Sequence, residues 1–134
     1  MSKPCHMNNS TVSRLATIVF AIVIIVFGII HFKDPGFIAQ RVPDFIPGNK
    51  LWVYIVGAAL ILAAIAFLLN KKVKLAGYLL ALLLIIFVLT VHLPLYLNTA
   101  DKESQYMSFM NLLKDTGLAC AALLIASRAS AASE

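Results

Sequence analysis

Five polar side chains lie inside, or at the ends of, long apolar segments: His31, His92, Asn111, Lys114 and Asp115. Imidazole, ammonium and carboxylate groups can bind ligands or exchange protons, and inside a membrane they commonly mark functional sites. Asn111 and Asp115 are four residues apart and share a helix face, whereas Lys114 is rotated by about 100° from Asp115. We expect Asp115 to face the inside of a helix bundle while Lys114 extends outward.

The composition places these side chains in a lipid environment. Of 134 residues, 61% are hydrophobic and only 13% are charged, and the mean hydropathy is +0.91. Soluble domains carry about 25% charged residues. The composition therefore excludes a soluble enzyme, a nucleic-acid binder, a disordered tail and a secreted disulfide scaffold, and it makes the lipid bilayer the first partner.

Four apolar segments are long enough to cross a membrane, which requires roughly 20 helical residues. Because lipid offers the backbone no hydrogen bonds, we predict an all-α integral membrane protein, a bundle of four transmembrane helices. The first segment is predicted to be a retained anchor rather than a signal peptide, because no small-residue cleavage site follows it. The predicted helices span residues 15–32, 51–70, 75–97 and 107–127, with a loop over 33–50 and tails over 1–14 and 128–134.

The basic residues predict an orientation for this bundle. Six of them fall on one side of the predicted membrane and four on the other: Lys3, Arg14, Lys71, Lys72, Lys74 and Arg128 against Lys33, Arg41, Lys50 and Lys102. Positively charged connections favour the cytoplasmic face. We therefore expect both termini to be cytoplasmic and the loop over residues 33–50 to be external.

With this topology the unusual polar groups fall in the outer half of the membrane. His31 ends the first predicted helix, His92 lies about 26 Å into the third, and Asp115 lies about 18 Å from the inner boundary. The spacing predicts one polar pocket formed by His31, His92, Asn111, Lys114 and Asp115. Two simpler interpretations remain open: interfacial histidines with no ligand, and a structural ion pair between Lys114 and Asp115.

Cofactor and thiol chemistry find less support in the sequence. Haem iron could be held between His31 and His92, but no aromatic or glycine pattern indicates a porphyrin slot. Zinc or copper on these histidines and Asp115 has no spacing signature. Cys5 and Cys120 form no Cys-x-x-Cys motif, so a dithiol would have to come from a partner. The chain has no self-contained catalytic motif, and no catalytic residue or metal site is assigned.

Packing expectations follow from small and aromatic residues. Ala59 with Ala63, and Gly117 with Ala121, are small residues four apart, which predicts stripes of close helix contact. In the loop over residues 33–50 we expect Phe45 and Ile46 to contact the bundle or lipid.

Several motifs together carry a resemblance to a known family. Gly28-Ile29-Ile30-His31-Phe32 is followed by Pro35 and by Pro43-Asp44-Phe45-Ile46-Pro47, His92-Leu93-Pro94 closes the third segment, and residues 111–115 read Asn-Leu-Leu-Lys-Asp. In this combination and order, over residues 28–126, the chain resembles the DoxX-like membrane proteins. Many members carry a glutamate in the second helix where this chain has Leu60, so a carboxylate role at that position does not transfer.

The resemblance implies a context more than a reaction. It implies a four-helix bundle of a bacterial-type inner membrane, acting as an accessory subunit of a redox or quinone-linked system, with a redox protein or a second copy of the chain as partner. A quinone head would then lie near His31, His92 and Asp115. The alternatives are a small-solute or proton transporter, suggested by Lys114 and Asp115, and a purely structural or assembly protein.

Overall fold

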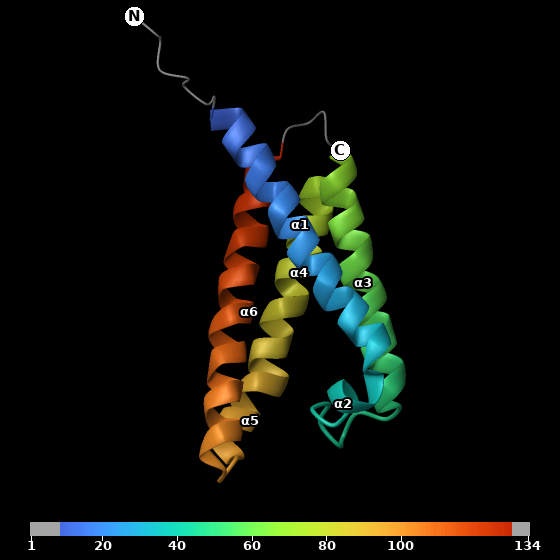
Figure 1. The fold of residues 1–134 in the computed structure, drawn as a ribbon, viewed down its shortest axis with the longest axis vertical. Coiled ribbons are helices and arrows are strands. Elements are labelled where there is room, and N and C mark those ends of the chain that lie inside the picture. Colours follow the sequence, from blue (N-terminus) through green and yellow to red (C-terminus); the bar gives the residue numbers. More distant parts are fainter. Residues whose placement is uncertain (1–8, 130–134) are drawn as a thin grey trace, which may run out of the picture.

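The computed structural model describes residues 9–129, and throughout that part the chain is helical with short connections. Four helical segments are long and apolar enough to cross a membrane (Figure 1). The predicted all-α bundle of four membrane-length helices is confirmed. The segments are α1 (Asn9–Lys33), α3 (Asn49–Leu69), the run of α4 (Val73–Phe87), η1 (Val88–His92) and α5 (Leu93–Asn98), and α6 (Lys102–Arg128); the short α2 (Pro35–Ala39) lies between α1 and α3.

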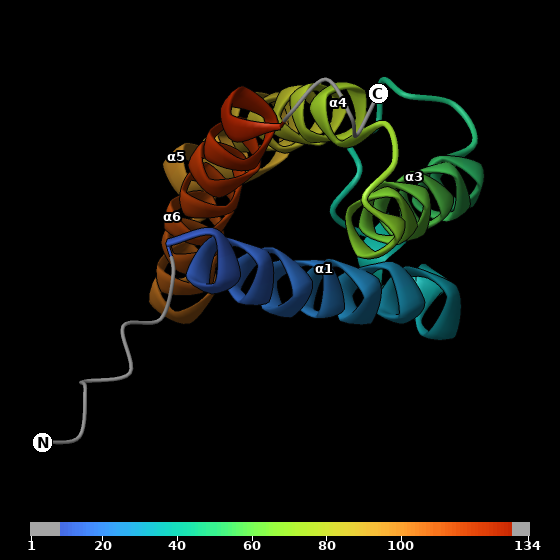
Figure 2. The ribbon, with the colours of Figure 1, turned by 90° about the horizontal axis from the view of Figure 1, so that it is seen from above.

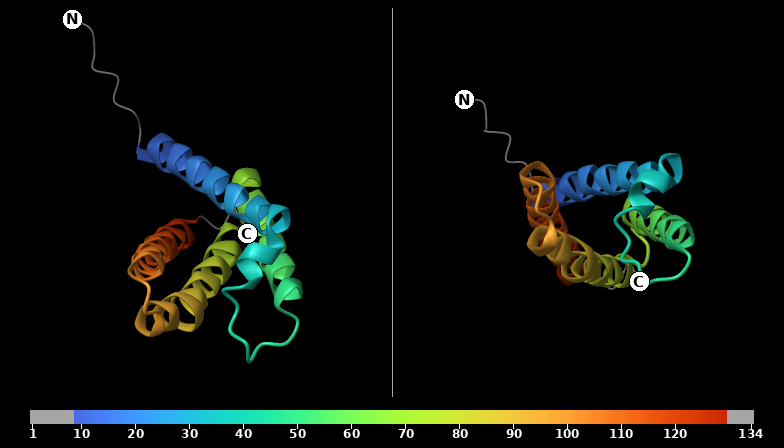
Figure 3. Two further views of the ribbon diagram at one scale, coloured as in Figure 1. Left: turned by 60° about the horizontal axis from the view of Figure 1, so that its bottom comes forward. Right: turned by 90° about the horizontal axis from the view of Figure 1, so that it is seen from below.

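The helices alternate in direction along the chain. The start of α1, the α3–α4 turn and the end of α6 lie at one end of the bundle, and α2 and α5 lie at the other (Figure 1). Seen along the bundle, the order around the ring is α1, α3, α4 and α6 (Figure 2). Figure 3 shows the α2 loop and α5 on separate sides of the end opposite the start of α1.

Glycines determine which helices approach closely. Gly28 of α1 and Gly57 of α3 face each other, so that a Cβ built on either would lie 3.1 Å from the carbonyl oxygen of the other. In the second pair, a Cβ on Gly77 of α4 would lie 2.8 Å from the Ala122 carbonyl oxygen of α6. The bundle is therefore built from two tight pairs, α1 with α3 and α4 with α6.

The predicted small-residue stripes are wrong at two of their positions. Ala59 is exposed, and the space around Gly117 is open. The contact face of α3 instead carries Gly57, Leu60 and Ala64. In helices that are apolar all round, small residues on several faces satisfy the same spacing, so spacing alone did not select the contact face.

Arg14 joins the two helices of the first pair at the end where α1 begins. Its guanidinium nitrogens donate to the carbonyl oxygens of Phe67 and Leu68, at 2.7 and 2.6 Å. These carbonyls belong to the last turn of α3, where intrahelical partners run out and the helix dipole favours a cation. Arg14, counted in the sequence only as an orienting charge, therefore caps a neighbouring helix.

Two helices begin five or six residues before the predicted position. α1 begins at Asn9, six residues before the expected start, and α6 begins at Lys102, five residues early. The N-cap of α6 explains the second difference, because the Asp101 carboxylate accepts a hydrogen bond from the Ser104 amide at 2.9 Å. Hydrogen bonds from Ser104 lower the pKa of Asp101 below its ordinary value.

The loop between α1 and α3 packs against the bundle at some residues and leaves others exposed. Ala39 is buried, and the Trp52 indole donates to the Pro47 carbonyl oxygen at 3.0 Å, which ties the loop to α3. Ile46 is half-buried, whereas Phe45 is 80% exposed and does not pack into the bundle. Phe45 is thus left for lipid or solvent.

The glycine contact between α4 and α6 can be tested against a glycine that has open space. Gly77→Ala would place a methyl group 2.8 Å from a backbone carbonyl oxygen, so we expect it to destabilise the protein by about 1–3 kcal/mol. Gly117→Ala should be neutral or stabilising by up to about 1 kcal/mol. Thermal unfolding in detergent measures both, and equal stabilities of the two variants would contradict the close pairing of α4 with α6.

Candidate functional site

The candidate site begins with an irregular turn in the third membrane-length segment. Over Val88–His92 the helix widens to a π-helical turn, closed by a hydrogen bond from the Leu93 amide to the Val88 carbonyl oxygen. The cause is Pro94, which has no amide hydrogen and whose ring would collide with the Thr90 carbonyl of a regular α-helix. The wider turn relieves this collision and fixes the direction of the last residue of the turn, His92.

His92 is directed at the buried acid of α6. Its Nε2 lies 2.8 Å from Oδ2 of Asp115, and the two side chains are 12% and 7% exposed. An ionised carboxylate only accepts hydrogen bonds, so in this pair Nε2 of the imidazole is the donor. The contact joins the π-helical turn to the middle of α6.

Lys114 completes the ion pair and reaches a third helix. Its Nζ lies 3.3 Å from Oδ1 of Asp115 and donates to Oδ1 of Asn111, also at 3.3 Å. The same ammonium lies 4.4 Å from the centre of the Phe27 ring on α1, a cation–π contact. We expected Lys114 to extend outward; its side chain is 38% exposed but lies against Phe27 and so connects the two helix pairs.

His31 lies apart from the other four predicted residues. Its Nδ1 donates to the Phe27 carbonyl oxygen of the preceding helical turn at 2.7 Å. Its Cβ lies where a side chain on Gly57 would collide, which places His31 at the α1–α3 contact. The structure thus brings together His92, Asn111, Lys114 and Asp115, which form the polar cluster. His31 is connected to this cluster through Phe27.

Phe27 also contacts the cluster, and the sequence did not predict this contact. Its carbonyl oxygen accepts from His31 while its ring contacts the Lys114 ammonium. A weak signal was present, because Phe27 and His31 are four residues apart and so share a helix face. Phenylalanine is common in this chain, however, and no spacing separates this ring from those that contact only lipid.

One nitrogen of this cluster has no partner. Within residues 9–129, His92 Nδ1 is the buried side-chain nitrogen or oxygen for which no hydrogen bond is found. Such atoms are rare in folded proteins and call for a physical explanation. With Nε2 donating to Asp115, Nδ1 of a neutral imidazole holds a lone pair that can accept a hydrogen bond or a proton.

The described part of the structure supports neither a metal site nor thiol chemistry. Within residues 9–129, no three histidine, cysteine or acidic side chains gather in a group that could hold a metal ion. Cys120 is a free, exposed thiol on α6, and Cys5 lies outside the described residues. The imidazole, ammonium and carboxylate groups of the cluster can form hydrogen bonds and exchange protons.

Comparison with known proteins shows the family of this chain. Residues 20–132 match the model of a family described as a domain of unknown function, DUF8561. The chain belongs to this family. No curated protein matches the sequence, and no solved structure matches the fold. The match spans most of the chain, so the cluster lies within the DUF8561 domain.

Removal of the Asp115 charge tests how far the cluster stabilises this DUF8561 protein. Asp115→Asn leaves the Lys114 ammonium without its counter-ion, and we expect a loss of about 1–3 kcal/mol in the free energy of unfolding. The double variant Lys114→Met with Asp115→Asn should recover part of that loss, because no unpaired charge remains. Thermal unfolding in detergent measures both variants.

Asp44→Asn is the matched control, because Asp44 is exposed in the loop. It should leave the stability unchanged. An Asp115→Asn protein as stable as the Asp44→Asn protein would show that the ion pair does not hold α6 in place.

Proposed function

We propose that this protein is an accessory subunit of a redox or quinone-linked system of a bacterial-type inner membrane, and that its polar cluster binds a quinone head. The observation that carries the proposal is the unpartnered, buried Nδ1 of His92 in a cluster with Asp115 and Lys114. The resemblance to DoxX-like proteins supports the same context. The electron carriers would belong to the partner.

The chemistry of a quinone fits the groups of this cluster. A quinone oxygen accepts hydrogen bonds, and a quinol hydroxyl can donate one to an imidazole lone pair. Asp115 holds the imidazole by Nε2 and would stabilise its protonated form, so a proton can pass to or from Nδ1. The protein would bind the head and manage its proton, while its tail remains in lipid.

Movement of the Lys114 side chain would open the cluster to a ligand. Lys114 is the most exposed of the three charged or imidazole groups, and a cation–π contact is worth only about 0.5–2 kcal/mol. Movement of its flexible side chain away from Phe27 would uncover that aromatic ring and leave Oδ1 of Asp115 without its cation. Entry of a flat, apolar head group is therefore compatible with the observed packing.

Photolabelling in nanodiscs tests the proposal, with an azido derivative of decylubiquinone as the probe. We expect crosslinks in the peptides around His92 and Lys114, and an approximately tenfold weaker apparent affinity for His92→Gln, which corresponds to about 1.4 kcal/mol. Thr116→Val is the control, because the exposed Thr116 hydroxyl bonds only to its own helix at the Leu112 carbonyl oxygen. Equal labelling of both variants would refute quinone binding at this cluster.

A structural or assembly role is the second candidate, and one observation favours it. Both carboxylate oxygens of Asp115 already have partners within the protein. This alternative predicts the stability loss of Asp115→Asn but no ligand. A transporter has less support, because the charged groups of the cluster gather at one depth rather than at successive depths.

The proposed orientation places both chain termini and the α3–α4 turn in the cytoplasm, because that end carries the larger number of basic residues. Single cysteines at Lys71 and Asp44, both exposed, test it in a background with Cys5 and Cys120 replaced by serine. An impermeant maleimide added to intact cells should label Asp44→Cys and spare Lys71→Cys. The reverse labelling would invert the orientation.

A further inference from the structure

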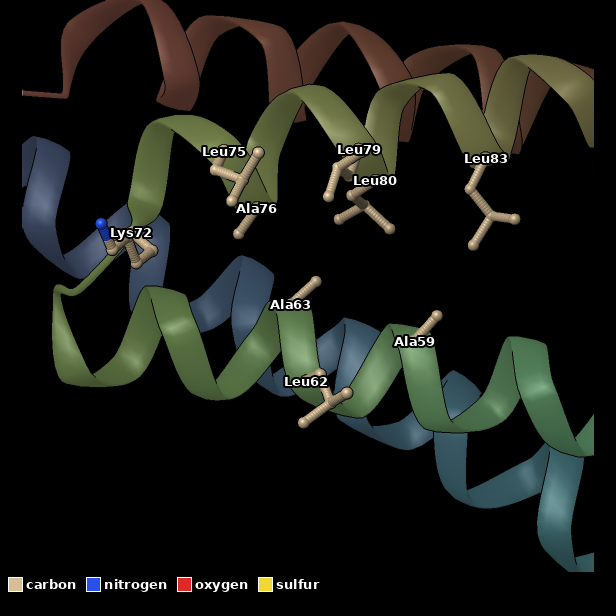
Figure 4. Close-up of a pocket in the computed structure, with 9 residues that line it drawn as sticks. All are labelled: Ala59, Leu62, Ala63, Lys72, Leu75, Ala76, Leu79, Leu80 and Leu83. Atoms are coloured by element: carbon tan, nitrogen blue, oxygen red, sulfur yellow. The ribbon is translucent and has the colours of Figure 1, made fainter. Parts of the chain in front are cut away.

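A groove between α3 and α4 extends to the turn that joins these two helices. It encloses about 380 Å³, and its walls are aliphatic except at one end, where Lys72 lies (Figure 4). Ala59 and Ala63 line the α3 wall, and Ala76, Leu79 and Leu83 line the α4 wall. The groove lies away from the cluster around Asp115.

Helix pairing explains why the groove exists. α3 pairs closely with α1, and α4 pairs closely with α6, whereas α3 and α4 share fewer close approaches. The turn of residues 70–72 holds their ends together, and small alanine side chains leave the space between them unfilled. In a membrane this space must be filled by an apolar group, because the surrounding solvent is lipid.

Lys72 has a backbone conformation that is unusual for its residue type. It caps the start of α4 with φ 54° and ψ 30°, in the left-handed region, and its side chain makes no capping hydrogen bond. Asparagine and glycine adopt this conformation more readily than lysine. Strained residues of this kind often lie at ligand-binding positions, so a lysine at the end of the groove indicates a role for its charge.

We propose that the α3–α4 groove binds an anionic glycerophospholipid. One acyl chain lies between the alanine and leucine side chains, and the phosphate contacts the ammonium of Lys72, with the exposed Lys71 beside it. The complementarity is of two kinds: an apolar groove for a hydrocarbon chain, and a basic end for a negatively charged head group. This inference is independent of the proposed redox role.

A second copy of the chain fits the groove less well. Two copies in one membrane share an orientation, and a two-fold contact at the groove would bring Lys72 of each copy to the same depth. Lys71 would add to this repulsion between like charges. An anionic lipid removes that repulsion, which is why the lipid is the occupant that the charge favours.

Native mass spectrometry of the detergent-purified protein tests the site, with palmitoyl-oleoyl phosphatidylglycerol and the matching phosphatidylcholine as probes. Lys72→Asn removes the charge and suits the left-handed backbone. We expect its affinity for phosphatidylglycerol to fall about fivefold, the factor expected for one basic residue at a lipid surface. Its affinity for phosphatidylcholine should stay unchanged, and its lipid-free thermal stability should be equal or higher.

Two further variants separate the groove from general surface charge. Ala59→Phe fills the groove at an exposed position and should weaken binding of both lipids without changing any charge. Lys50→Asn removes an exposed lysine at the opposite end of α3 and should change neither. Arg128 lines another groove, between α1 and α6, so the difference between variants is measured rather than the total lipid retained.

Three outcomes would overturn the proposal. Lys72→Asn could bind phosphatidylglycerol as tightly as the unaltered protein, which would remove the role of the charge. Ala59→Phe could leave lipid binding unchanged, which would place the lipid elsewhere. Ala59→Phe could instead abolish a dimer, which would make the groove an interface between two copies.

Discussion

The structure depends on one electrostatic constraint, the burial of the Asp115 carboxylate inside a membrane-length helix. An acid at mid-helix costs about 2.5–3.5 kcal/mol on insertion scales, and the cost falls only if its oxygens find partners. Here Oδ2 accepts from the His92 imidazole and Oδ1 faces the Lys114 ammonium. Both oxygens are therefore satisfied without water.

This constraint determines the local geometry of two other helices. For His92 to reach Asp115, the third segment must present the imidazole toward α6, and the π-helical turn before Pro94 provides that direction. Lys114 must remain near the acid, and its partly exposed side chain also lies against Phe27 of α1. Groups from α1, η1 and α6 are thus held together by one carboxylate, across the boundary between the two helix pairs.

The sequence was sufficient to predict the four membrane-length helices, because lipid imposes a simple rule on the length and polarity of a segment. It also indicated that His92, Lys114 and Asp115 lie at matched depth, since rise per residue converts position into height. Depth does not give rotation about the helix axis. His31 has the right height but faces the α1–α3 contact, and Ala59 has the right size but faces the groove.

Rotation was hard to predict because these helices are apolar on every side. In a soluble helix the polar face reveals the buried one, whereas α1 and α3 present hydrophobic side chains both to lipid and to their neighbours. Only steric exclusion distinguishes the faces, as at Gly57, where an added Cβ would lie 2.8 Å from the Cβ of His31 and 2.9 Å from the Phe32 ring of α1. The missed contact of Phe27 has the same origin.

The two ends of the bundle satisfy their charges in different ways. Toward the end that holds α5, the Asp115 charge is balanced by groups of the protein itself, and His92 Nδ1 is the buried side-chain polar atom within residues 9–129 that has no partner. At the other end, Arg14 is bound to helix carbonyls, while the ammonium groups of Lys71 and Lys72 are exposed. Charges that are paired inside a membrane protein fix how its helices pack. Exposed basic side chains at the membrane surface attract anionic lipids instead. A ligand at the first end must therefore compete with existing contacts, whereas a lipid at the second fills a groove that is already open.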